Sequence, residues 1–173
     1  MKTMIAAATL TLLIVGGARA EVVDAQPNGF EVRHQVIVNA PAAVVWATLV
    51  QPSKWWLSAH TWSGSAANLS LGAASGGCFC ERLPNGGSVL HMTTVYAAPG
   101  QKLVLSGALG PLQTSGANGA LTVLLAEKDG QTTVTFTYDV GGYFKGGLDK
   151  LAAPVDGVLG QQVASLKAAA EAR

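Results

Sequence analysis

The two cysteines of the chain stand two residues apart, in the segment Cys78-Phe79-Cys80. On a β-strand both sulfur atoms leave the same face, and the two Cα atoms lie about 6.6 Å apart, twice the rise per residue. That separation is close to the upper limit for a disulfide, so a bridge requires a local kink. The reactive alternatives are a strained redox pair or a soft-metal site completed by His34 or His91. We favour two unbridged cysteines that line a cavity or the core as small apolar side chains, because the sequence holds no further cysteine to complete a thiolate site.

Two histidines fall within alternating, strand-like patterns. His34 lies on the apolar face of the first such segment, and His91 alternates with Val89, Thr93 and Val95. An imidazole that faces a cavity could hydrogen-bond a ligand or move a proton. No carboxylate shares the predicted inward face of either strand, so we favour a hydrogen-bonded core histidine at both positions.

Aromatic side chains supply further candidate contacts to a ligand. Four tryptophans lie within seventeen positions, and large indoles are expected to anchor short helices in the core, with Trp56 also reaching a ligand. Phe136 and Tyr138 share one face of the last predicted strand, residues 132–139. The predicted ligand-binding residues are His34, Trp56, Cys78, Cys80, His91, Phe136 and Tyr138.

Several signatures of catalysis and cofactor binding are missing. The glycine-rich segment 141–147 lacks the Lys-Ser/Thr of a phosphate-binding loop, and the sequence has no Gly-x-Ser-x-Gly elbow and no paired histidines at metal spacing. The acids Glu81, Asp139, Asp149 and Asp156 fall at predicted turns, strand ends and exposed helix positions, where a solvated carboxylate is the ordinary case. We therefore predict no catalytic residue, metal ligand, cofactor or nucleotide.

The composition favours one ordinary globular domain. The chain has 173 residues, of which 49% are hydrophobic and 12% charged, with 11 basic and 10 acidic side chains. The low charge and the lack of a basic run argue against a nucleic-acid partner.

The first twenty residues are typical of a secretory signal. Lys2 precedes a short apolar stretch over residues 4–15, and Ala18-Arg19-Ala20 matches a small-x-small cleavage site. The stretch is too short for a membrane span, which needs about 20 apolar residues. We expect cleavage before Glu21 and export to the periplasm or the extracellular medium.

The remaining patterns indicate a strand, two short helices, several strands and a long helix. A polar lead-in, residues 21–29, ends in the turn Pro27-Asn28-Gly29, and residues 30–39 alternate as a strand. Short helices follow Pro41 and Ser53. Further strands are predicted at 78–83, 88–96, 101–106, 120–127 and 132–139. The C-terminal helix has its apolar stripe at Leu148, Leu151, Val155, Leu159, Val163, Leu166 and Ala170, with a break or late start expected near Pro154.

This order of elements predicts an α+β fold in which a curved antiparallel sheet wraps around one long C-terminal helix. Residues 30–173 form a single domain, because no linker or repeat divides them. A curved sheet has more concave area than one helix can fill, so an apolar cavity is expected between them. Such a cavity is the default ligand site.

Particular segments also resemble a known group of proteins. Ala43-Val44-Val45-Trp46, Gln51-Pro52 and Trp55-Trp56 resemble the opening helices of the SRPBCC superfamily, the START-like, helix-grip proteins. Residues 107–113, 138–143 and 155–162 are similar to an exported or small bacterial subset of its polyketide-cyclase-like and heat-shock ATPase-activator-like groups. The likeness extends over about residues 30–167. It implies a helix-grip domain with a ligand cavity and supplies no catalytic residue.

Three functions follow as hypotheses. The leading one is an exported, non-catalytic protein that binds a small apolar or amphipathic molecule. The alternative is a cyclase or hydrolase-type enzyme in which the cavity orients a substrate and His34, His91 or a tyrosine moves a proton. The third is a protein-interaction module, suggested by the ATPase-activator branch of the resemblance and disfavoured because an exported chain would not meet a cytosolic, ATP-driven chaperone.

Overall fold

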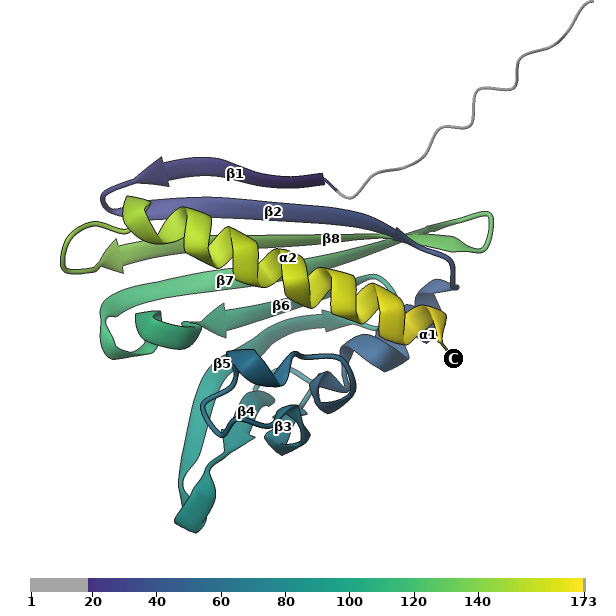
Figure 1. Ribbon diagram of the computed structural model, residues 1–173. Coiled ribbons are helices and arrows are strands. Elements are labelled where there is room, and N and C mark those ends of the chain that lie inside the picture. The colour runs from purple at the N-terminus through teal and green to yellow at the C-terminus, as the bar shows by residue number, and fades with distance from the viewer. Residues whose placement is uncertain (1–18, 173) are drawn as a thin grey trace, which may run out of the picture.

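Figure 1 shows the computed structural model of the chain, which describes residues 19–172. In that part of the chain one eight-stranded sheet, antiparallel at every pairing, curves along the long helix α2 (Asp149–Glu171). The strand order across the sheet is β1-β2-β8-β7-β6-β5-β4-β3. The strands are β1 (Arg19–Gln26), β2 (Gly29–Val38), β3 (Leu69–Leu71), β4 (Cys78–Arg82), β5 (Ser88–Ala98), β6 (Lys102–Gly107), β7 (Gly116–Lys128) and β8 (Gln131–Tyr143). This architecture confirms the predicted α+β helix-grip fold.

The edge strand β1 differs from the sequence-based expectation. Residues 21–26, predicted as part of a polar lead-in, pair with β2, with Glu21 opposite Arg33 and Val22 opposite Val32. An edge strand of this kind forms because its backbone pairs with the neighbouring strand. A polar segment with little alternation therefore cannot be recognised as a strand from its own sequence. The predicted turn at Pro27-Asn28-Gly29 does connect β1 to β2.

The centre of the sheet supplies the wall against which α2 packs. On β2 and β8 every second side chain is buried, as the alternation predicts. The buried side chains of these strands are Phe30, Val32, His34, Val36, Val38, Thr132, Val134, Phe136, Tyr138 and Val140. Leu159, Val163 and Leu166 of α2 are each at most 2% exposed and complete this part of the core.

Short helical pieces connect the strands. They are α1 (Ala42–Leu49), η1 (Pro52–Lys54), η2 (Ser58–His60), η3 (Ala66–Asn68), η4 (Pro84–Gly86) and η5 (Gly110–Thr114). The second short helix expected after β2 is only the single 3-10 turn η1. Trp55 and Trp56 follow it and are both buried, with ring centroids 5.3 Å apart. Consecutive side chains of an α-helix point in different directions, so burying both indoles favours an irregular segment here.

The helix α2 continues through Pro154 without the break predicted there. Proline occupies the sixth position of the helix, so the hydrogen bond it removes is the one to the Lys150 carbonyl, close to the helix start. The apolar stripe remains packed on both sides of this position, which keeps the helix continuous. No helix within residues 19–172 has the length and apolar character needed to span a membrane.

Candidate functional site

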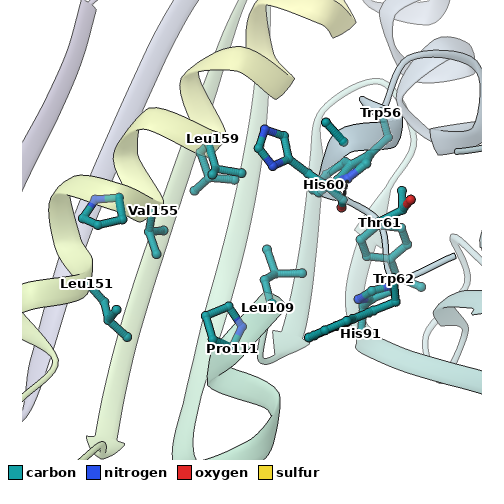
Figure 2. A pocket seen from close by; sticks show the side chains of 15 residues that line it. Trp56, His60, Thr61, Trp62, His91, Leu109, Pro111, Leu151, Val155 and Leu159 are labelled. Atoms are coloured by element: carbon teal, nitrogen blue, oxygen red, sulfur yellow. Dashed lines mark hydrogen bonds between the residues drawn. The ribbon is translucent and has the colours of Figure 1, made fainter. Parts of the chain in front are cut away.

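A pocket of about 360 Å³ lies beneath the N-terminal half of α2. Figure 2 shows Leu151, Val155 and Leu159 of the helix on one wall and Trp56, Thr61, Trp62 and His91 across from them. The His60 ring extends from the loop toward Leu159, Pro111 comes from η5, and Leu109 directly precedes η5. The remaining lining residues are Ala59, Phe79, Gly110, Pro154 and Val158. The pocket is therefore enclosed mainly by aliphatic, proline and aromatic side chains, with a few polar groups between the loop and the sheet.

A β-bulge places His91 in the pocket wall. The register of β4 against β5 moves from Phe79 opposite Met92 to Cys80 opposite Leu90, which skips His91. His91 and Met92 are consequently both buried although they are adjacent. The sequence pattern predicted that His91, Thr93 and Val95 share one face of the strand. This prediction is wrong after the bulge, since Val95 is 50% exposed.

Gly107 of β6 accommodates this bulge. It stands opposite Met92 and has a φ of 153°, and a Cβ at this position would lie 2.5 Å from the carbonyl oxygen of His91. Glycine is therefore required for the close approach of β6 to the bulged strand.

Glu81 of β4 is buried next to His91, whereas the sequence pattern predicted a solvated carboxylate. It is 1% exposed, and its Oε2 lies 3.0 Å from His91 Nε2. The backbone N–H of Trp62 donates to the same oxygen at 3.1 Å, and the backbone N–H of Ser63 donates to Oε1. Burial alone would raise the pKa of Glu81, but the hydrogen bonds from Ser63, Trp62 and His91 outweigh it and lower that pKa.

Gln113 determines which ring nitrogen of His91 carries the hydrogen. The indole Nε1–H of Trp62, which can only donate, donates to Gln113 Oε1 at 2.7 Å, and Gln113 Nε2 donates to the carbonyl of Leu90 at 3.2 Å. The amide nitrogen also lies 3.3 Å from His91 Nδ1, so Nδ1 accepts and the ring hydrogen is on Nε2, facing Glu81. Burial lowers the pKa of His91 and Glu81 partly offsets this, so the neutral ring is favoured.

The other predicted histidine, His34, lies outside the pocket. Its Nε2 is 2.8 Å from Asp156 Oδ1, and its ring lies against the backbone of α2. A Cβ at Gly160 would lie 2.9 Å from His34 Cε1, so the glycine makes room for the ring. His34 thus connects β2 to α2.

Phe136 and Tyr138 occupy the core between the sheet and the pocket. Phe136 packs edge to face against Trp55, at a centroid distance of 6.5 Å. The hydroxyl of Tyr138 accepts a hydrogen bond from the backbone N–H of Leu109 at 3.2 Å, and burial raises the pKa of this phenol to about 12. Tyr138 therefore supports the loop that carries Leu109 and does not itself line the pocket.

The two cysteines form a disulfide, contrary to the favoured sequence interpretation of unbridged side chains. Their Cα atoms are 5.4 Å apart, closer than alternate residues of a regular strand, and the register shift of β4 against β5 occurs at the same place. The shortened Cα–Cα separation is the local kink in β4 that a bridge was expected to require. Cys78 and Cys80 are partly exposed and alternate with the buried Phe79 and Glu81, so the sulfur atoms are not among the groups that line the pocket.

Of the seven predicted site residues, the structure thus brings Trp56 and His91 together in the pocket wall. Phe79, Thr61 and Leu109 line the same pocket and were not predicted. The Phe79 ring lies over His91 at a centroid distance of 5.0 Å. Because the two cysteines were expected to face the cavity, strand alternation placed Phe79 on the opposite face, and so its inward position was not predicted. Within residues 19–172 no group of three or more His, Cys, Asp or Glu is arranged to hold a metal ion.

Comparison with solved structures shows the same fold in several proteins of low sequence identity. An uncharacterised protein from Rhizobium leguminosarum is 18% identical, with 90% of this chain and 99% of that chain covered and a TM-score of 0.63. A protein from Chromobacterium violaceum is 14% identical, with 82% and 96% covered and a TM-score of 0.58. The solution structure of the Aha1 dimer from Colwellia psychrerythraea is 19% identical, with 82% and 96% covered and a TM-score of 0.57.

The sequence also matches a family of proteins over most of its length. No curated protein matches the chain significantly. Residues 29–171 match the family described as polyketide cyclase / dehydrase and lipid transport, a range that covers the sheet from β2 onward and nearly all of α2. The chain therefore belongs to this family, within the SRPBCC superfamily of helix-grip proteins.

Proposed function

We propose that this protein binds a small apolar or amphipathic molecule in the pocket beneath α2 and releases it unchanged. The observation that carries the proposal is the pocket itself. Its volume of about 360 Å³ falls in the range of sites for small molecules, and its walls are mostly aliphatic and aromatic. The family description, which includes lipid transport, supports a ligand of this chemistry.

The contacts of His91 and His34 argue against either of these two histidines acting as a general base. Both ring nitrogens of His91 are engaged, one by Glu81 and the other by Gln113. A general base needs a free lone pair within reach of its substrate, and the Nδ1 lone pair is already used. His34 lies outside the pocket, with its Nε2 2.8 Å from Asp156 Oδ1.

The alternative function is a cyclase or hydrolase-type enzyme. One observation favours it, because a buried carboxylate oriented on an imidazole is a common arrangement for moving a proton. His91→Gln separates the two functions, since glutamine retains a donor toward Glu81 and cannot act as a base. Our proposal predicts that the wild-type protein and the variant both bind ligand and that neither converts it. A wild-type protein that converts its ligand and a folded variant that does not would favour the enzyme.

We also propose that the protein acts after export. The predicted signal, residues 1–20, falls almost entirely outside the described residues, and a disulfide between Cys78 and Cys80 is compatible with an oxidising compartment. Mass spectrometry of the protein from whole cells and from the exported fraction tests this proposal. A mature chain that begins at Glu21 in the exported fraction is expected, and an uncleaved chain confined to the cytosol would contradict it.

A titration with N-phenyl-1-naphthylamine, a neutral fluorescent probe, tests ligand binding. Val155 faces the pocket, so Val155→Trp fills it and is expected to weaken binding by roughly tenfold or more. Ala153 is exposed on the same helix and does not line the pocket, so Ala153→Trp is the matched control. Probe binding that is equal in both variants would mean that the pocket is not the site.

A further inference from the structure

We infer that the pocket selects uncharged ligands that bring a hydrogen-bond donor, such as a phenol or an alcohol on a hydrocarbon body, and rejects carboxylates, sulfonates and phosphates. The inference rests on the proposed function, because it specifies the ligand class of the same pocket. It follows from the hydrogen bonds already made by each polar group in the wall.

The side-chain donors of the pocket are all occupied by protein acceptors. The indole N–H of Trp56 donates to the carbonyl of His60 at 3.0 Å, and that of Trp62 donates to Gln113 Oε1 at 2.7 Å. The hydroxyl of Thr61 donates to the carbonyl of Ser58 at 2.7 Å.

The donors of the two imidazoles in the pocket are likewise occupied by protein acceptors. His91 Nε2 donates to Glu81 at 3.0 Å, and His60 Nε2 lies 3.2 Å from Gln161 Oε1, which can only accept. A ligand anion would therefore find no free side-chain donor among the described residues that line the pocket.

Several backbone donors next to the ligand space are also used by protein acceptors. The N–H groups of His60 and Thr61 donate to the carbonyls of Leu57 and Ser58, that of Trp62 donates to Glu81, and that of Leu109 donates to the Tyr138 hydroxyl. An ionised headgroup that loses its water here would have few replacement hydrogen bonds, and desolvating an unpaired charge is costly.

The charge of the wall also disfavours an anion. Neither lysine nor arginine is among the described lining residues, and the nearest buried charge behind His91 is the carboxylate of Glu81. Because the hydrogen bonds from Ser63, Trp62 and His91 stabilise this carboxylate, it remains negative and repels a second anion across the imidazole.

The groups that remain free in the wall are acceptors. Thr61 Oγ1 donates its hydrogen to Ser58 and keeps lone pairs for a ligand, and the His60 tautomer that donates from Nε2 to Gln161 has an acceptor at Nδ1. Thr61 and His60 are neighbours in sequence on the loop beside the pocket, and the His60 ring extends from the loop toward Leu159 and contacts Gln161 of α2 (Figure 2). A ligand can thus place its hydrocarbon against α2 and its donor against the loop.

Competition among three naphthalenes of similar size tests the inference directly. N-phenyl-1-naphthylamine serves as the reporter, and 2-naphthol, 2-methoxynaphthalene and 2-naphthoate are added at neutral pH, where only the last is charged. We expect 2-naphthol to compete roughly tenfold or more better than 2-naphthoate, and roughly threefold better than 2-methoxynaphthalene, which has no donor.

The substitution Gln113→Ala provides a second test, in which the binding of the anion is expected to improve. Gln113 does not line the pocket, and its removal frees the indole N–H of Trp62, so 2-naphthoate is expected to gain at least a few-fold relative to 2-naphthol. Thr61→Val removes one of the two free acceptors and should reduce the preference for 2-naphthol over 2-methoxynaphthalene, whereas Thr61→Ser should retain it in full.

The outcomes separate this inference from the function on which it rests. If the reporter does not bind the wild-type protein, the proposed function fails. If the reporter binds and 2-naphthoate competes as well as 2-naphthol, the pocket still binds ligands but the inferred selectivity is wrong. Equal competition by 2-naphthol and 2-methoxynaphthalene would overturn the donor requirement in the same way.

Discussion

At the scale of single residues, one chain of hydrogen bonds organises the polar side of the pocket. It runs from Glu81 through His91 and Gln113 to Trp62, and each orientation in it is set by a group that can only donate or only accept. The sequence was sufficient to single out His91 as an inward-facing histidine. Glu81 could not be predicted as its partner, because burial of a carboxylate depends on donors from Trp62 and Ser63 that lie 19 and 18 residues away along the chain.

The protonation of this pair predicts how stability depends on pH. Because burial lowers the pKa of His91 in the folded protein, the unfolded chain binds more protons as the pH falls below the ordinary histidine value of about 6.5. The free energy of unfolding should therefore decrease from pH 7 to pH 5, with a slope of at most about 1.4 kcal/mol per pH unit from this one group. The lowered pKa of Glu81 adds a further loss at lower pH, below about 4.5.

The substitution His91→Gln isolates the contribution of His91. Urea unfolding of both proteins between pH 5 and pH 8, followed by tryptophan fluorescence, should show a smaller acid-induced loss in the variant, which retains every other titrating group. Parallel curves for the two proteins would mean that His91 has the same pKa in the folded and the unfolded chain.

At the scale of elements, the sequence predicts the regular strands and helices from their periodicity, but it does not predict the places where a strand or helix departs from that periodicity. The strands β2, β7 and β8 and the long helix follow from alternation and from a 3.6-residue repeat. The bulge at His91 has no comparable signal, because it depends on Gly107 from a strand that is distant in sequence. The continuity of α2 through Pro154 likewise depends on packing against the sheet.

Two glycines of α2 provide a test of how this helix meets the sheet. At Gly157 a Cβ would have no neighbour within 4 Å, whereas at Gly160 it would lie 2.9 Å from the buried ring of His34. We expect Gly157→Ala to raise the free energy of unfolding by about 0.8 kcal/mol, the helix-propensity gain. Gly160→Ala should lower it, because the clash with His34 outweighs that gain.

Thermal and urea unfolding of the two variants check this pair. In a His34→Ala background the cost of Gly160→Ala should disappear, since the ring that it meets is gone. A stabilising Gly160→Ala in the wild-type background would contradict the contact between His34 and α2.

The disulfide on β4 is expected to contribute modestly to stability. It closes a loop of only three residues, for which the chain-entropy relation gives about 1.6 kcal/mol. The double substitution Cys78→Ser and Cys80→Ser should therefore leave a folded protein whose free energy of unfolding is lower by about this amount. Urea unfolding measures the loss, and wild-type protein in a reducing agent should match the variant. A double variant that is unfolded without denaturant would show that β4 depends on the bridge.

At the scale of the whole molecule, the pocket results from the unequal extent of a curved sheet and a single helix. The C-terminal half of α2 packs closely, with Val163, Leu166 and Ala170 each about 1% exposed. The N-terminal half lies where β5, β4 and β3 bend away from the helix (Figure 1), and the loop that carries Trp56 and Trp62 closes the remaining space only in part. The existence of a cavity could be predicted from the order of elements, but its position along α2 depends on where the sheet bends.

The central claim is that a ligand occupies the pocket between α2 and the loop with Trp56 and Trp62. The indole N–H signals of the four tryptophans, observed by NMR in ¹⁵N-labelled protein, test it directly during a titration with N-phenyl-1-naphthylamine. Trp56 and Trp62 line the pocket and Trp46 does not, so the first two signals should shift and that of Trp46 should stay nearly in place. A titration in which the Trp46 signal shifts most, or in which no indole signal shifts at saturation, would contradict the account.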